Sequence, residues 1–195
     1  MRPVLYYDLG SPYGYLAVER AGSVLGVEPE LEPIVLGAIF KYRDRGSWAH
    51  TDQREAGMCE VERRATAYGL PPLAWPPGWP PNTLSAMRAA AWAKGIGKGA
   101  EFAVAAYRAA FVEGRDLADL AVVAEAASAA GLPASDVPAA VQDPSVKEAL
   151  RAATDAAGEA GVRGVPTLRI ADGIYYGDDQ LEAAAQLSRA AQPPP

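Results

Sequence analysis

The sequence has very little cysteine and histidine, and this scarcity excludes several kinds of chemistry. Its 195 residues include one cysteine, Cys59, and one histidine, His50. A single cysteine cannot form a disulfide within the chain or a dithiol redox centre, and a metal site built from cysteine and histidine is excluded too. Cys59 falls within a helical pattern of apolar residues, so we expect it to be a packed small side chain. His50 falls in a polar segment, so we expect it at the surface.

Basic charge and long apolar runs are also scarce. The chain has 18 basic and 24 acidic residues, a net charge of −6 and no basic cluster, so nucleic-acid binding is not expected. No apolar run is long enough to span a membrane, and the first residues lack the charged and apolar regions of a signal peptide. We therefore expect a soluble, cytoplasmic protein. Hydrophobic residues make up 50% of the chain, which is enough for a core.

What the sequence does contain is organised around residues 8–15. Residues 3–8 have strand character, and a helix is predicted over 12–25, ended by Gly26. Ser11 stands where a helix N-cap belongs, and Pro12 stands at the first helical position, where its missing N–H would be unpaired anyway. Free N–H groups and the positive end of the helix dipole meet at such a turn and attract anions. An ordinary capped turn is the alternative explanation of the same residues.

The elements that follow are predicted from periodicity and turn signals. A second strand over 30–36 would pair in parallel with the first through a right-handed crossover. A loop over 42–51 leads to a helix over 52–68, with Thr51 or Asp52 as its cap and Glu55 available for a capping box. The proline-rich segment 70–82 excludes a helix or an inner strand. Further helices are predicted over 83–94, 98–113, 116–130 and 143–160.

Strand character returns near the end of the chain. Residues 167–171 and 174–176 are predicted strands, and Asp172-Gly173 between them is a strong hairpin signal. A last helix would start at Asp178 or Asp179 and run to about residue 191. The chain thus begins strand–helix–strand and ends strand–strand–helix, with a long helical region between.

Motifs at separate places in the chain resemble those of one known family. Residues 11–14, Ser-Pro-Tyr-Gly, resemble a thioredoxin-type Cys-Pro-Tyr-Cys site in which both cysteines are replaced. Residues 164–167 resemble the loop that carries a cis-proline in thioredoxin folds. Residues 176–182 resemble a Gly-x-Asp-Arg segment, and 81–89 resemble a central helix start with Asn-Ser/Thr. In this order the motifs resemble the 2-hydroxychromene-2-carboxylate isomerases and kappa-class glutathione transferases, over nearly the whole chain.

This resemblance implies an α/β chain with a DsbA-like, thioredoxin-like fold and a large all-helical insertion. Residues 1–41 and 161–195 would form the two halves of the thioredoxin-like domain. Residues 42–160 would form the inserted helical domain. The seam between insertion and sheet, above Ser11, is where we expect a ligand cleft.

The resemblance also implies glutathione as cofactor. Ser11 would be the catalytic residue, donating a hydrogen bond to the glutathione sulfur and favouring its thiolate. Pro12 and Tyr13 complete the motif on the cofactor side. Val165 would pair its backbone with the cysteinyl part of the tripeptide, next to a cis Pro166.

Two parts of the predicted cofactor site depart from the family pattern. Asp179 matches the family's aspartate and would bind the γ-glutamyl ammonium. Asp178 stands where the family has Ser or Gln, and it would meet the same end of glutathione or simply cap the last helix. The Asn of the family's Gly-Asn-x-Pro-Pro is missing from 42–48. Arg43 or Arg45 would replace it by pairing with the glycyl carboxylate, or would be solvated loop charges in a site that has lost glutathione.

The leading hypothesis is therefore a glutathione-dependent isomerase or transferase for a small aromatic-derived, unsaturated substrate, working as a homodimer. Tyr13, Trp48, Trp75 and Trp79 are candidates to line its substrate pocket. Trp75 and Trp79 would alternatively pin the proline-rich loop or form a polyproline binding surface. The competing hypothesis is a redox-inactive binding or regulatory protein of the same fold. The missing cysteines and asparagine favour it, and the Ser-Pro-Tyr and Gly-x-Asp elements disfavour it.

Overall fold

The computed structural model describes residues 2–42 and 46–190, and for Tyr42 and residues 188–190 it describes the backbone alone. The strands are β1 (Val4–Tyr7), β2 (Glu30–Pro33), β3 (Thr167–Ile170) and β4 (Gly173–Tyr176). The α-helices are α1 (Pro12–Leu25), α2 (Leu36–Tyr42), α3 (Arg54–Ala67), α4 (Leu84–Gly95), α5 (Gly99–Phe111), α6 (Leu120–Ala129), α7 (Val137–Ala140), α8 (Pro144–Glu159) and α9 (Leu181–Ala190). Short 3-10 turns occur at η1 (Trp48–His50), η2 (Ala134–Asp136) and η3 (Asp178–Gln180).

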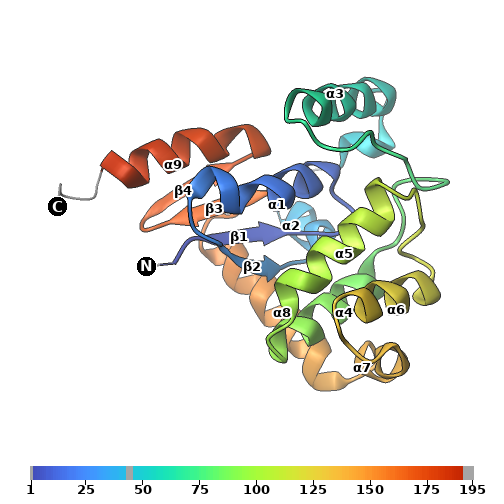
Figure 1. Cartoon of the computed structure of the whole chain (residues 1–195). Coiled ribbons are helices and arrows are strands. Elements are labelled where there is room, and N and C mark those ends of the chain that lie inside the picture. The colour runs from blue at the N-terminus through green and yellow to red at the C-terminus, as the bar shows by residue number, and fades with distance from the viewer. Residues whose placement is uncertain (1, 43–45, 191–195) are drawn as a thin grey trace.

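The strands form one mixed sheet in the order β2-β1-β3-β4 (Figure 1). The pair β1–β2 is parallel, and β3 runs antiparallel to both β1 and β4. Leu5 of β1 lies opposite Leu31 of β2 and Leu168 of β3. The parallel pair needs the crossover that α1 supplies, whereas β3 and β4 are joined by a tight hairpin at Asp172-Gly173.

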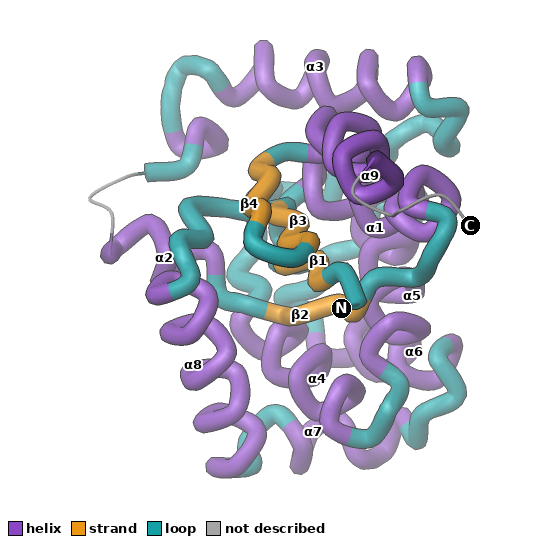
Figure 2. The backbone as a smooth tube through the Cα atoms, turned by 90° about the vertical axis from the view of Figure 1, so that its left-hand side faces the viewer, coloured by secondary structure: helices purple, strands orange, loops and turns teal. Residues whose placement is uncertain are grey.

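Successive residues of β1 point to opposite faces of the sheet, and each face has its own helices. Leu5 packs with Ala17 and Ala21 of α1 and with Leu181 and Ala184 of α9. On the opposite face, the next residue, Tyr6, packs in a cluster that α2 and α8 complete: Ile34, Ile39, Ala157, Val162 and Val165. Figure 2 shows the strands between these two pairs of helices. The predicted α/β thioredoxin-like fold with a helical insertion is thus confirmed.

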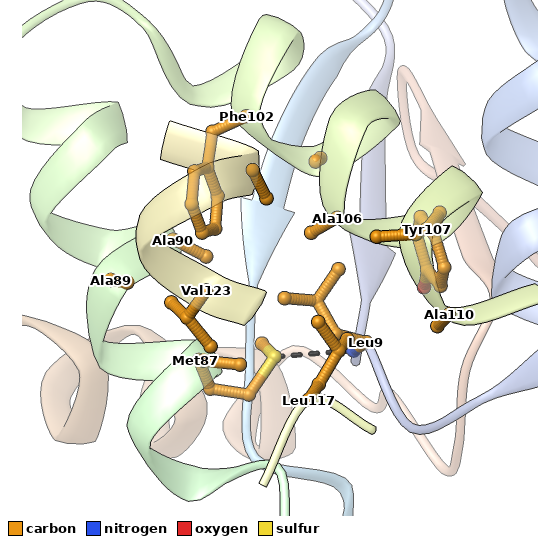
Figure 3. Packing of buried hydrophobic residues seen from close by; sticks show 14 of the residues in the cluster. Leu9, Met87, Ala89, Ala90, Phe102, Ala106, Tyr107, Ala110, Leu117 and Val123 are labelled. Carbon is orange, nitrogen blue, oxygen red and sulfur yellow. Dashed lines mark hydrogen bonds between the residues drawn. The ribbon is translucent and has the colours of Figure 1, made fainter. Parts of the chain in front are cut away.

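The largest core joins the insertion to the end of β1. It contains Tyr7, Leu9 and Tyr15 together with the alanine-rich faces of α4, α5 and α6. The small alanine side chains let these helices approach closely, and Phe102 and Val123 fill the space between them (Figure 3). The Leu9 N–H lies 3.2 Å from the Met87 sulfur, so the chain just after β1 is fixed against α4 (Figure 3).

Most predicted elements are present with bounds close to those expected. The helix over 12–25 is found as predicted, capped by Ser11 and ended by Gly26 in the left-handed region. The predicted strand 30–36 ends at Pro33, and a helix that was not predicted, α2, occupies residues 36–42, from the end of that predicted strand to the first residue of the predicted loop. Among the described residues, no helix has the length and apolar character needed to cross a membrane.

Two predictions about α3 are wrong. This helix begins after Gln53, whose side chain makes no capping bond, so the capping box does not form. The Thr51 hydroxyl instead donates to the Trp48 carbonyl and accepts the Gln53 N–H. Cys59 is exposed rather than packed, because the fully buried residues of α3 are Val61 and Ala65 and Cys59 does not lie on the face that they form.

Candidate functional site

A cavity of about 670 Å³ opens where β1 runs into α1. Its walls come from the first residues of α1, from α2 and η1, from the proline-rich segment before α4, and from β4. The residues around it are Asp8, Gly10, Ser11, Pro12, Tyr13, Val35, Leu36, Gly37, Phe40, Lys41, Ser47, Trp48, His50, Trp79, Pro80, Pro81, Asn82, Thr83, Leu84, Met87, Val165 and Tyr176. The predicted seam between sheet and insertion therefore holds a cavity of ligand size.

Ser11 lies in the cavity wall and also caps α1. Its backbone is extended, its Oγ accepts the Gly14 N–H at 3.2 Å, and its own N–H donates to the Asp8 carbonyl at 2.9 Å. The side chain is 5% exposed. The capping explanation is thus correct, but the cap uses only an acceptor lone pair of the hydroxyl. Among the described residues no bond takes up the hydroxyl proton, so Ser11 can cap the helix and donate to a ligand at once.

Gly14, at the place of the second cysteine of a dithiol motif, has no room for a side chain. A Cβ there would overlap the Tyr107 hydroxyl, which is fully buried and donates a hydrogen bond of 2.8 Å to the Asp8 carbonyl. Tyr107 comes from α5, so the insertion occupies the position that a second thiol would need. The sequence pattern alone did not reveal this exclusion.

Asp8 is a site residue for which the sequence predicted no role. Its Oδ1 accepts from the Gly10 N–H at 2.9 Å and the Thr83 hydroxyl at 3.2 Å, and its Oδ2 accepts the Leu36 N–H at 2.8 Å. Burial raises the pKa of this carboxyl, while these hydrogen bonds act in the opposite direction. The carboxyl ties together three chain segments that line the cavity. The feature of the sequence that could have identified Asp8 as a site residue is its position directly after a buried strand.

Aromatic side chains form one side of the cavity. The Trp48 ring lies 6.1 Å from Tyr13 and 5.2 Å from Trp79, measured between centroids. Trp79 is 3% exposed, its indole N–H donates to the Gly10 carbonyl at 3.3 Å, and its own carbonyl accepts two bonds from Arg54. The Trp75 ring packs against the Trp79 ring with 4.8 Å between centroids, and Trp75 does not line the cavity. The prediction that the tryptophans pin the proline-rich segment is therefore confirmed for Trp79.

Lys41 and His50 bring polar groups to the same cavity. Lys41 lies in the last turn of α2 and His50 ends η1, and both line the cavity together with the first residues of α1. His50 is exposed, as predicted, but sequence reasoning did not connect it with the site. No local sequence pattern could have connected His50 with the cavity, because that connection depends on the tertiary structure.

The loop before β3 has the predicted geometry. The Val165–Pro166 peptide bond is cis, and Val165 lines the cavity. The Pro166 carbonyl accepts the Gly177 N–H at 2.9 Å, which holds this loop against the end of β4. Pro166 itself does not line the cavity.

Asp178 and Asp179 lie beyond the lining residues of the cavity. Asp178 is 1% exposed, and its carboxylate accepts from Arg64 at 2.8 Å and from the Tyr68 hydroxyl at 3.0 Å. Burial raises the pKa of Asp178, and Arg64 counteracts this. The side chain binds α3 rather than capping α9, which begins at Leu181. Asp179 is half exposed, 3.6 Å from Arg64. Arg43 and Arg45, the predicted partners of a glycyl carboxylate, lie outside the described residues.

Comparison with known proteins gives consistent results. The family model for the DSBA-like thioredoxin domain matches residues 4–188. A 2-hydroxychromene-2-carboxylate isomerase of Sphingobium xenophagum is 28% identical over 184 residues, which are 91% of this chain and 92% of the relative. A solved structure of 2-hydroxychromene-2-carboxylate isomerase superposes with a TM-score of 0.86 at 22% identity, covering 97% of both chains. The cytosolic disulfide reductase DsbM from Pseudomonas aeruginosa with GSH has a TM-score of 0.62 at 18% identity and covers 97% of this chain and 100% of its own.

Proposed function

The chain belongs to the DSBA-like thioredoxin domain family, and we propose that it is a glutathione-dependent isomerase or transferase for aromatic-derived unsaturated substrates. The observation that carries this proposal is the Ser11 hydroxyl. It lies in the cavity wall at the N-terminus of α1, with its acceptor used by Gly14 and its proton available. The similarity to 2-hydroxychromene-2-carboxylate isomerase over most of both chains supports the same reaction class.

Ser11 and α1 together would stabilise a bound thiolate. A free thiol has a pKa of about 8.5 and is mostly protonated at neutral pH. A donated hydroxyl proton and the positive end of a helix both favour the charged form. Ser11 itself is not a nucleophile in this proposal, because among the described residues its Oγ bonds only to a backbone N–H and to no histidine or lysine base.

The rest of the chain supplies groups that fit glutathione. Val165 lines the same cavity as Ser11, and no hydrogen bond among the described residues uses its peptide N–H or C=O. These groups are free to pair with an extended peptide as an added strand would. Asp179 is exposed and negative, which suits an ammonium group. Glutathione, when bound here, would provide the thiol that adds to an unsaturated carbon and is later expelled.

The remaining cavity suits a flat apolar substrate. Tyr13, Trp48 and Trp79 give it an aromatic wall, and Phe40 and Met87 add further apolar surface. Its volume of about 670 Å³ lies within the range of small-molecule sites. Lys41 at the rim provides one positive charge for an acidic substituent.

We also propose that the protein works as a cytoplasmic homodimer. A cytosolic relative with the same fold supports the location, and the resemblance to kappa-class transferases supports the dimer. Sedimentation of the purified protein checks the assembly, and a monomeric profile at micromolar concentration would contradict it.

Calorimetric titration with glutathione tests the proposed function, and we expect binding at millimolar ligand or below. The absorbance of bound thiolate against pH should then differ between the wild type and Ser11→Ala. Loss of a charge-assisted hydrogen bond worth about 1.5–3 kcal/mol should raise the bound thiol's pKa by about one unit or more. Ser23→Ala is the matched control, because Ser23 lies in the same helix and its hydroxyl donates to the Arg20 carbonyl, its one hydrogen-bond partner in the described structure.

The outcome separates the two hypotheses drawn from the sequence. No binding of glutathione at millimolar concentration would leave a redox-inactive binding or regulatory protein as the better description. An unchanged thiol titration in Ser11→Ala would assign Ser11 to the fold alone.

A further inference from the structure

Arg64 is a cation at the border of the cavity that the sequence did not single out. Its Nη1 lies 2.8 Å from Asp178 Oδ1, and its Nε lies 2.8 Å from Glu60 Oε1. The side chain is 23% exposed, so the charge is shielded but still accessible. Among the described residues, no hydrogen bond uses the second terminal nitrogen, Nη2. An anionic group approaching from solvent would therefore find an available donor.

The Arg64 guanidinium packs against Tyr13, a residue that lines the cavity. Its central carbon lies 5.4 Å from the centroid of the Tyr13 ring, and Tyr13 lines the cavity two residues after Ser11. Asp179 Oδ2 lies 3.6 Å from Arg64 Nη1 and is on the surface. A cation and an exposed carboxylate thus stand side by side, next to the wall that Ser11 and Tyr13 share.

Asp178 holds the Arg64 guanidinium in place from the buried side. Both of its oxygens are occupied, one by Arg64 and the other by Tyr68, and it is almost fully buried. Because it is buried, it does not present a carboxylate oxygen to a ligand in the way Asp179 does. Its negative charge holds the guanidinium against the end of β4 and orients it.

We infer that Arg64 binds the α-carboxylate at the γ-glutamyl end of glutathione while Asp179 binds the adjacent ammonium. The inference rests on the proposed glutathione site. An amino-acid end carries both charges on one carbon, and Arg64 with Asp179 presents the complementary pair. Arg64 is in this view a specificity residue: it selects thiols that carry a free α-carboxylate at this end, and Asp178 is its positioning residue.

The experiment compares two ligands on two proteins by calorimetry. The ligands are glutathione and its analogue in which the γ-glutamyl α-carboxylate is a carboxamide, and the proteins are the wild type and Arg64→Gln. We expect the wild type to bind glutathione about tenfold more tightly than the amide, a difference of about 1.4 kcal/mol. Arg64→Gln should lose this tenfold preference and bind both ligands alike. Arg63→Gln is the matched control on the same helix, since Arg63 is 67% exposed and, within the described part of the chain, pairs only with Glu60.

Each outcome decides a separate point. A wild type that binds glutathione and the amide equally well overturns the inference about Arg64 without any variant. A tenfold preference that persists in Arg64→Gln also overturns it, and an equal loss for both ligands shows a structural role instead. Failure of the wild type to bind either ligand refutes the proposed function and this inference with it.

Discussion

The packing of Gly14 against Tyr107 leads to a prediction that contradicts ordinary helix propensity. Gly14 is in the first turn of α1 with a backbone that alanine can adopt, so Gly14→Ala would by propensity stabilise the protein by about 0.5–1 kcal/mol. A Cβ at this position overlaps the Tyr107 hydroxyl oxygen. The ring cannot easily move, because it is fully buried and lies 5.9 Å from Tyr7 and 6.2 Å from Phe111.

Overpacking of this kind costs about 1–3 kcal/mol, so the net effect of Gly14→Ala should be a loss of about 1–2 kcal/mol. At about 2–4 °C per kcal/mol for a chain of this size, the melting temperature should fall by several degrees. Tyr107→Phe removes the overlapping oxygen and one donor to the Asp8 carbonyl, a loss of about 0.5–1.5 kcal/mol. The double variant should then be less destabilised than the sum of the two single variants by about 1 kcal/mol.

Denaturant unfolding of the four proteins measures this coupling. Gly95→Ala is the control, because Gly95 ends α4 with no neighbouring atom within 4 Å of the methyl group that alanine would add, and this variant should follow propensity alone. If Gly14→Ala is as stable as Gly95→Ala, or if the two changes add within about 0.5 kcal/mol, the argument that Tyr107 excludes a side chain at Gly14 is refuted.

Other predictions follow from the same site. Burial raises the pKa of Asp8, so the folded state holds this proton more tightly than the unfolded state, and the stability it contributes falls as pH rises above about 3.9. Asp8→Asn should flatten that part of a pH series of unfolding free energies, and an unchanged slope would contradict the assignment. Ser11→Cys should form a mixed disulfide when its thiolate attacks oxidised glutathione and releases one glutathione. Because no resolving thiol is present at Gly14, mass spectrometry should find the adduct until external thiol is added, and its spontaneous loss would count against the geometry. Trp48→Leu should weaken binding of an aromatic substrate while glutathione titrates as in the wild type, and an equal loss for both would show that Trp48 supports the whole site.

The sequence was informative at several places where a local rule acts, although the capping box predicted for α3 did not form. Ser11 before Pro12 predicted the start of α1, and Asp172-Gly173 predicted the hairpin, because caps and turns depend on a few neighbouring residues. Val165 and Pro166 could be placed only through the family resemblance. The start of α2 could not be predicted, since the Leu36 N–H is held by the distant carboxylate of Asp8.

Contacts between distant segments are the part of the site that no local pattern contains. Arg64 meets Asp178 across 114 positions of the chain, and Trp79 reaches the Gly10 carbonyl across 69. The exposure of Cys59 has the same origin, because α3 packs through very few side chains and its apolar pattern does not show this. Lys41 and His50 are likewise brought to the cavity by the tertiary arrangement of α2 and η1, which no local pattern gives.

The two positions that correspond to the cysteines of a Cys-Pro-Tyr-Cys motif differ in physical character, and Tyr107 links them. Position 11 keeps a small polar side chain that still caps α1 and still has a proton to donate. Position 14 is a glycine, and the Tyr107 hydroxyl occupies the space that a side chain there would need. That hydroxyl donates to the Asp8 carbonyl, which also accepts the Ser11 N–H at 2.9 Å, so the group that excludes a second thiol also fixes the turn carrying Ser11. In the proposed function, such a site would hold a thiolate that arrives with a ligand, and with a single cysteine in the chain, at position 59, it has no second thiol with which to resolve a disulfide.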